Sequence, residues 1–305
     1  VEDVDNIKVT LHDGETTTAE LIASRVRNDL ALIRVKSDRP LPTIPRGTSS
    51  DLMAGESVIA IGNAFGYVHT STQGIISALH RDVPVNETQE YVDLIQISAG
   101  INPGNSGGPL LNIEGEMIGV NVAVRVGAQQ IAFAIPIDQV VETVTEMIEQ
   151  QNDSRLAIGL RTSGGPREGD GVTVSDVSAS SPAAREGLKP GDRVVRVGSQ
   201  EVDNKLEFSL ALMGLSPGDA MQLEIERGGE RFDLALTTER RTADSYTVKE
   251  LAWSIIGVQA KPVPDSTMRR LNSSMRTRYR GGLYVTAVKP GSAAERQGII
   301  AGDVL

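Results

Sequence analysis

Short apolar runs separated by turn residues dominate the first 137 positions of the chain. Gly, Pro and Asp recur between the runs, as at His12-Asp13-Gly14 and Glu114-Gly115. This spacing is typical of all-β sandwiches and barrels. It predicts strands at Ile7–Leu11, Leu30–Val35, Ser57–Gly62, Gly74–Leu79, Leu94–Ile97, Pro109–Leu111, Met117–Val124 and Ile131–Ile135.

The hydrophobic period changes after Pro136. Asp138–Gln151 carries Val, Met and Ile at helical spacing, with Asp138 as the N-cap, and this predicts one helix. Gln150–Arg155 is polar and is interpreted as a linker.

An internal repeat follows this linker. Two modules share identical residues at a constant offset of 111 positions, which predicts two copies of one fold. The matched residues are Gly171, Val174, Val177, Ser181, Ala183, Gly187, Gly191 and Asp192 in copy one, and Gly282, Val285, Val288, Ser292, Ala294, Gly298, Gly302 and Asp303 in copy two. In copy one we expect strands at 157–162, 172–177, 193–197, 220–227 and 231–237, and helices at 182–186 and 205–213.

Composition and charge narrow the function classes. The 305 residues suggest two or three domains, and 30 Lys and Arg against 40 Asp and Glu give a formal charge of −10. An acidic chain without basic runs is a poor nucleic-acid binder. The chain has no Cys, which excludes disulfides and thiol chemistry, and it has only three His, at positions 12, 69 and 80. Since no Walker motif and no cluster with metal-ligand spacing is present, no cofactor and no metal are expected.

The segment Asn102–Leu111 contains the candidate catalytic residues. Ser106 stands between glycines just before an apolar strand. Glycines let consecutive backbone N–H groups point toward one place beside a hydroxyl, so Gly104, Asn105 and Ser106 are the candidate oxyanion hole for a Ser106 nucleophile. A plain Gly- and Ser-rich turn is the alternative interpretation.

The run GNSGGPLL resembles the active-site segment of trypsin-like serine proteases of the HtrA/Deg family. DLALIRV (29–35), VIAIGNAFG (58–66), GIISALHR (74–81) and IAFAIPI (131–137) resemble that family as well, and SPAAREGLKPGDRV (181–194) is similar to a PDZ signature. The resemblance covers essentially the whole chain. It implies a mainly β fold, a trypsin-like double β-barrel followed by two PDZ-like α+β domains.

By this resemblance, Ser106 and Asp29 are the nucleophile and the orienting acid of a Ser-His-Asp triad. Read without the family, Asp29 is a turn residue that opens a strand. The family's His lies in an Asn-His-Val-Val segment that aligns two positions before Val1, and none of the three His present fits it. The chain as given is therefore expected to be inactive. We interpret it as an N-terminally truncated fragment; a natural pseudoprotease is the alternative.

The resemblance also implies binding residues. Ile101 and Val124 are expected to line a pocket for small aliphatic side chains. Ile131, Ala132 and Phe133, in the stretch Ile131–Ala134, are expected to pair with the substrate backbone. Ile158, Gly159 and Leu160 resemble a PDZ carboxylate-binding loop, with Phe208 and Leu212 lining its groove. Core packing is the alternative for these apolar residues.

The expected domains are an incomplete protease domain at 1–152, a first PDZ domain at 153–242 and an incomplete second one at 248–305. The implied function is ATP-independent serine endopeptidase activity on misfolded envelope proteins, in the periplasm or cell envelope. Unfolded polypeptides and peptide C-termini are the expected partners, and a homotrimer or larger assembly is expected for the full-length protein. A non-catalytic PDZ adaptor or stress sensor is the alternative. Missing strands are expected to destabilise the barrel, so that a proteolysis-resistant core lies near 155–240.

Overall fold

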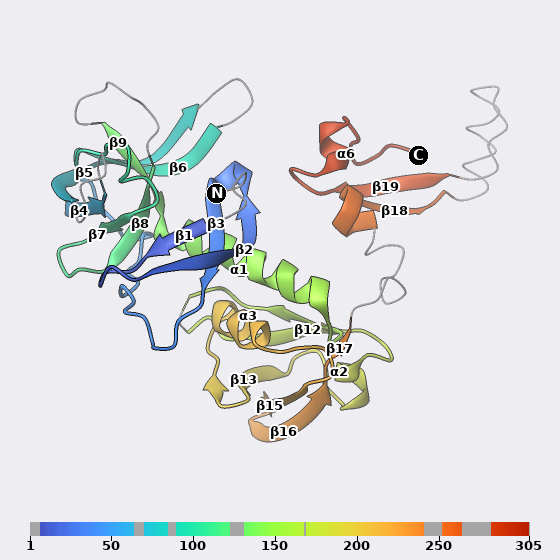
Figure 1. The fold of residues 1–305 in the computed structure, drawn as a ribbon. Helices are drawn as coiled ribbons and strands as arrows, with labels where there is room; N and C mark the ends of the chain where they lie inside the picture. Colours follow the sequence, from blue (N-terminus) through green and yellow to red (C-terminus); the bar gives the residue numbers. More distant parts are fainter. Residues whose placement is uncertain are drawn as a thin grey trace, which may run out of the picture. The chain divides into compact units, whose positions relative to one another are not determined.

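The computed structural model describes residues 7–63, 70–84, 90–122, 131–167, 169–240, 252–263 and 282–304. The chain separates into two compact units, Val1–Glu239 and Arg240–Leu305 (Figure 1). No helix in these described ranges is long and apolar enough to cross a membrane.

The first unit begins with a three-stranded antiparallel sheet in the order β1-β2-β3. Its strands are β1 (Ile7–Thr10), β2 (Thr16–Arg25) and β3 (Leu30–Val35). The ten-residue strand β2 was not predicted, because its apolar positions are sparse and a register shift between Leu21 and Ala23 interrupts their alternation. A 3-10 turn, η1 (Val26–Asn28), leads from β2 into Asp29 and β3.

Six strands then form a closed barrel in the order β4-β5-β6-β9-β8-β7. Their bounds are β4 (Ser57–Gly62), β5 (Thr70–Pro84), β6 (Glu90–Ile97), β7 (Pro109–Leu111), β8 (Met117–Val122) and β9 (Ala132–Pro136). The predicted strands of this region are confirmed within the described residues. Alternate side chains such as Val58, Ala60, Ile76, Ile95, Ile97 and Leu110 fill the interior. Closure pairs every strand on both sides, which removes the free edges of an open sheet.

Helix α1 (Ile137–Arg155) leaves the barrel and continues through the stretch that we interpreted as a linker. That interpretation was wrong, because the polar residues at its end find partners in the next module. Asn152 is only 4% exposed, and its Nδ2 donates to the carbonyl of Ser209 at 2.7 Å.

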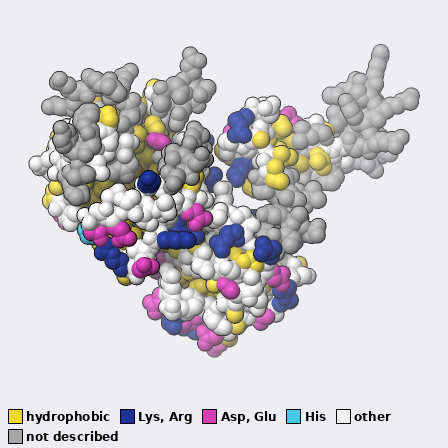
Figure 2. Space-filling view, viewed as in Figure 1, with side chains coloured by type: hydrophobic (Ala, Val, Ile, Leu, Met, Phe, Trp, Pro, Cys, Tyr) yellow, Lys and Arg dark blue, Asp and Glu magenta, His cyan; other side chains and the backbone are white. Residues whose placement is uncertain are grey.

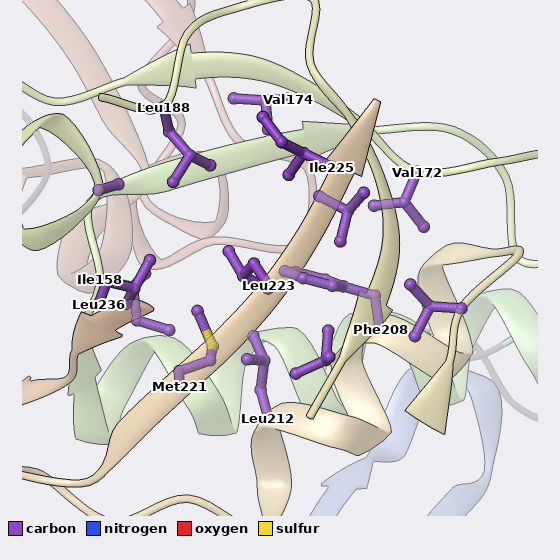
Figure 3. Close-up of a cluster of buried hydrophobic side chains, with 14 of the residues drawn as sticks. Ile158, Val172, Val174, Leu188, Phe208, Leu212, Met221, Leu223, Ile225 and Leu236 are labelled. Atoms are coloured by element: carbon purple, nitrogen blue, oxygen red, sulfur yellow. The ribbon is translucent and has the colours of Figure 1, made fainter. Parts of the chain in front are cut away.

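The next module is the first copy of the repeat. It contains β10 (Leu156–Ala157), β11 (Leu160–Ser163), β12 (Thr173–Val177), α2 (Pro182–Arg185), β13 (Arg193–Val197), β14 (Gln200–Glu201), α3 (Lys205–Met213), β15 (Ala220–Arg227), β16 (Glu230–Thr237) and β17 (Glu239–Arg240). The bounds of β13, α3 and β15 are those predicted. Phe208 and Leu212 of α3 pack with Leu223 and Ile225 of β15 in one buried cluster (Figure 3).

The second unit repeats the local structure of copy one. It has a π-helical turn η4 (Ala252–Ile256), β18 (Val258–Pro262), β19 (Leu283–Val288) and α6 (Ala293–Arg296). Ser181 accepts a hydrogen bond from the backbone N–H of Ala184, and Ser292 accepts the equivalent bond from Glu295, so both short helices have the same N-cap. The repeat is therefore confirmed in three dimensions.

Apolar side chains gather on the visible face of the second unit (Figure 2). Leu283 is 48% exposed, whereas Val172, its counterpart in copy one, is fully buried. The other exposed large apolar residues of the described part of this unit are Ile255, Ile256, Tyr284, Ile300 and Val304.

Candidate active site

Ser106 is exposed on the turn that enters β7. Gly104 has a φ of 104° and Gly107 a φ of 81°, backbone conformations that favour glycine. Within the described residues, the backbone N–H groups of Gly104 and Ser106 have no hydrogen-bond partner, whereas Asn105 N–H donates to the Asn102 carbonyl at 2.9 Å. Two of the three candidate oxyanion donors are thus free, and the third is used within the turn.

The barrel holds this turn from two sides. On one side, the N–H of Asn63, just after β4, donates to the Gly104 carbonyl at 3.0 Å. On the other, the Gly107 N–H donates to the Asn121 carbonyl in β8, and the Asn121 N–H donates to Gly108, both at 2.9 Å. The position of the Ser106 hydroxyl is therefore set by strands that are themselves part of the closed barrel.

Close packing also fixes the turn. A Cβ on Gly62 would lie 2.5 Å from Asn105 Cα, and a Cβ on Gly108 would lie 2.1 Å from the Ile61 carbonyl oxygen. Asn105 is completely buried under the turn. Asn63, Gly62 and Asn121 were not predicted as supports of the turn, although residues 61–63 lie in a segment that resembles the family.

Asp29 lies at the end of η1 with a φ of 52°. Its carboxylate Oδ2 accepts a hydrogen bond from the hydroxyl of Tyr91, in β6, at 2.8 Å. Burial of the Tyr91 hydroxyl, together with its hydrogen bond to Asp29 and the charge of that carboxylate, raises the pKa of Tyr91 to about 12. This hydrogen bond connects Asp29 to the barrel that also positions Ser106. Tyr91 was not singled out from the sequence, since no local pattern connects it with Asp29.

The predicted substrate contacts fall in different environments. Ile101 is half-buried against the barrel core, and Val124 lies outside the described residues. Phe133 and Ala134 of β9 pair with β6 on one side and with β8 on the other. This corrects the expectation that a substrate strand adds along Ile131–Ala134, because Phe133 and Ala134 have no free edge. Ala132 is buried, and Ile131 is 45% exposed just before the strand.

Two of the three histidines can be located. His12 is in the turn between β1 and β2. His80 lies inside β5, beyond the end of the predicted strand Gly74–Leu79, with a φ of 55° and its Nδ1 2.5 Å from Asp93 Oδ1. His69 lies outside the described residues. No group of three or more possible metal ligands occurs in the described part of the chain.

The predicted PDZ residues surround one glycine. Gly159 has a φ of 79°, and a Cβ there would lie 2.0 Å from the Ser181 side chain. Ile158, Phe208 and Leu212 are buried in the core of copy one, and Leu160 packs against that core from the first residue of β11. Whether these residues also line a peptide groove stays a prediction.

Comparison with known proteins agrees with this architecture. The trypsin-like peptidase domain family matches residues 1–120, and the PDZ domain family matches residues 145–238. A probable periplasmic serine endoprotease, DegP-like, from Halomonas elongata is 34% identical over the whole of this chain, which covers 65% of that protein. A protein of the same description from Hahella chejuensis is 33% identical, again over the whole chain and 67% of the relative.

Among solved structures, an HtrA-type protease, AlgW, with a decapeptide is 33% identical, with 79% of this chain and 77% of that chain covered and a TM-score of 0.45. The chain spans about two thirds of the length of the curated relatives it matches. Their names and the two matched domain families place this sequence in one group: the chain belongs to the HtrA/Deg family of trypsin-like serine endoproteases that carry PDZ domains.

Proposed function

We propose that the protein is an ATP-independent serine endopeptidase of the cell envelope that degrades misfolded proteins. The single observation that carries this proposal is the Ser106 turn. Ser106 is exposed, and the N–H groups of Gly104 and Ser106 are free of partners in the described residues. The relatives described as periplasmic endoproteases support the location and the reaction class.

The reaction needs a base beside the serine. An imidazole takes the proton of the Ser106 hydroxyl as its oxygen attacks a peptide carbonyl, and a carboxylate orients that imidazole. Asp29 is the proposed carboxylate. The N–H groups of Gly104 and Ser106 then donate to the oxyanion of the tetrahedral intermediate. Since none of His12, His69 and His80 fits the family position, the 305-residue chain by itself is expected to be inactive.

Peptide binding is proposed at two places. Ile101 and Val124 would select small aliphatic side chains before the cleaved bond. In the first PDZ-like module, the backbone around Gly159 would receive a free peptide carboxylate while the peptide adds beside β11. A homotrimer or larger assembly is proposed for the full-length protein, as the resemblance implies.

Cleavage of unfolded casein tests the proposal. The protein expressed from its whole gene should cleave casein after small aliphatic residues, and Ser106→Ala should abolish this cleavage. The 305-residue chain should cleave nothing. If the whole-gene protein leaves casein intact but still binds peptides with a free C-terminus, the non-catalytic PDZ adaptor is the correct function. Cleavage that persists in Ser106→Ala would show that another residue is the nucleophile.

A further inference from the structure

The Asp29 carboxylate has one hydrogen bond among the described residues, and Tyr91 supplies it. Asp29 is exposed at the end of a short turn in the left-handed backbone region. An exposed aspartate in such a turn can rotate about its side-chain bonds unless a partner holds it. The Tyr91 hydroxyl donates to Oδ2 at 2.8 Å, and Oδ1 accepts no bond in the described part of the chain.

Tyr91 is well placed to hold another group, because it is itself fixed. It pairs with Val83 in the β5–β6 ladder of the barrel. Its half-buried ring packs against the buried cluster of Leu94, Val122, Phe133 and Ile135. Leu30, the residue after Asp29, packs against the same cluster, so the chain around Asp29 and the Tyr91 ring share one support.

The chemistry of the hydroxyl fits this task. Burial and the neighbouring carboxylate raise the pKa of Tyr91 to about 12. The hydroxyl therefore keeps its proton at any pH at which a serine protease works, and it stays a donor to the carboxylate. A lasting donor on Oδ2 leaves Oδ1 as the oxygen available to another partner.

We propose that Tyr91 is a positioning residue of the catalytic centre: its hydroxyl holds Asp29 Oδ2 so that Oδ1 faces the imidazole of the base. This inference rests on the proposed function, in which Asp29 orients that imidazole. Tyr91 touches neither substrate nor reacting atoms in this scheme. It acts only through Asp29, and it does so from the barrel that also carries Ser106.

A purely structural role makes a different prediction. In that case the bond from Tyr91 would simply fasten the β1–β3 sheet to the barrel, and its loss would matter whether or not Asp29 is present. A positioning role requires that the effect of removing the hydroxyl disappears once Asp29 can no longer orient the base. A double-mutant cycle of Tyr91 and Asp29 distinguishes the structural role from the positioning role.

The cycle compares Tyr91→Phe, Asp29→Asn and the double variant in the protein expressed from its whole gene, with a peptide substrate. Tyr284→Phe is the matched control, because it removes the same hydroxyl from a partly exposed ring in the second unit. We expect Tyr91→Phe to lower kcat about 10-fold with KM unchanged, as for loss of one hydrogen bond to a charged group. The double variant should be no slower than Asp29→Asn, and the control should match wild type.

Full activity of Tyr91→Phe would overturn the inference, and so would a 10-fold loss that recurs in the Asp29→Asn background. If the wild-type protein is as inactive as Ser106→Ala, the proposed function fails and this inference fails with it. The contact is tested without activity in the 305-residue chain, by NMR of 13Cζ-labelled tyrosine. Tyr91 should titrate near pH 12, and Asp29→Asn should lower that value; an unchanged titration would show that the two groups do not interact.

Discussion

At the scale of single residues, the strands that hold the Ser106 turn leave no room for a methyl group at Gly62 or Gly108. Gly62 shows this most directly, because an added Cβ would lie 2.5 Å from Asn105 Cα and 2.7 Å from its Oδ1. Both atoms belong to a completely buried residue next to the nucleophile. The Cα atom cannot move without shifting the turn that carries the oxyanion donors.

We therefore expect Gly62→Ala to displace the Ser106 turn. Overpacking of this kind lowers the free energy of unfolding by about 1–3 kcal/mol. Gly100→Ala is the matched control, since a Cβ at Gly100 meets nothing within 4 Å. We compare the two variants of the whole-gene protein by thermal unfolding and by casein cleavage, and we expect only Gly62→Ala to be less stable and less active. Equal stability and activity of the two variants would show that the turn is looser than described.

Asp192 is a buried carboxylate in the first PDZ-like module. Its side chain is 1% exposed and accepts hydrogen bonds from Arg227, at 2.6 and 2.7 Å, and from the Lys189 N–H at 2.8 Å. Burial alone would raise the pKa of Asp192, but the bonds from Arg227 and Lys189 and the charges of these residues outweigh it and lower the pKa.

A carboxyl group with a lowered pKa in the folded state stabilises the fold above its unfolded pKa, and this contribution is lost as the pH falls through the folded pKa. We expect Asp192→Asn to lower the free energy of unfolding by about 2 kcal/mol at neutral pH, because it removes the charge of a buried carboxylate that accepts hydrogen bonds from the partly exposed Arg227. The difference from wild type should shrink below about pH 4. Amide exchange of β13 and β15 measures this difference in stability. Glu201→Gln is the control, because Glu201 belongs to an exposed ion pair. A difference that stays constant down to pH 2 would contradict this account.

At the scale of elements, α1 joins the barrel to the first PDZ-like module as a continuous helix. Three polar contacts fasten its last turns to α3 and to the residues directly after α3. Asn152 donates to the Ser209 carbonyl, Arg155 donates to the Leu215 carbonyl at 2.6 Å, and Glu149 pairs with Lys205 at 2.9 Å. Carbonyls at the end of a helix lack partners within it, and Arg155 also donates to such a carbonyl, that of Met213, at 3.4 Å.

Removal of these contacts should convert the end of α1 into the flexible linker that its polarity suggests. We expect Asn152→Ala with Arg155→Ala to raise amide exchange in 150–157 at least 10-fold, since each lost bond is worth about 1 kcal/mol. Ser154→Ala serves as the control, because the Ser154 hydroxyl donates to the Gln151 carbonyl in its own turn and to no other group among the described residues. Exchange unchanged from wild type would mean that α1 holds its end without α3.

The elements also show what a sequence can predict. Strand β13, helix α3 and strand β15 were predicted to the residue, because strong periodicity is bounded there by Gly or by the N-cap Asn204. The end of α1 was missed because its partners are 50 or more positions away in the sequence. The same holds for the site: local glycines indicated Ser106, whereas Tyr91 meets Asp29 across 62 positions.

At the scale of the whole chain, the six-stranded barrel closes within residues 57–136. We had expected a barrel weakened by missing strands, and a resistant core near 155–240. Because the barrel is closed and α1 packs on α3, we now expect the barrel and the first PDZ-like module to resist proteolysis together. In the second unit, by contrast, large apolar side chains remain exposed, including Leu283 and Ile300.

Limited proteolysis of the 305-residue chain should therefore leave a fragment from β4 to β16, and the second unit should be cut first. Few buried contacts and exposed apolar surface mark regions that open easily. Mass spectrometry of the fragments identifies their ends. A resistant fragment restricted to 155–240 would show that the barrel opens in solution and that the first expectation was right.

The central claim, that Ser106 is the nucleophile of a serine endopeptidase, is tested most directly by covalent labelling. A fluorophosphonate reacts with a serine hydroxyl that a neighbouring base activates. In the native protein from the whole gene, the account predicts one labelled peptide, which contains Ser106, and no label after denaturation or in Ser106→Ala. A native protein that cleaves casein while Ser106 stays unlabelled would contradict the account.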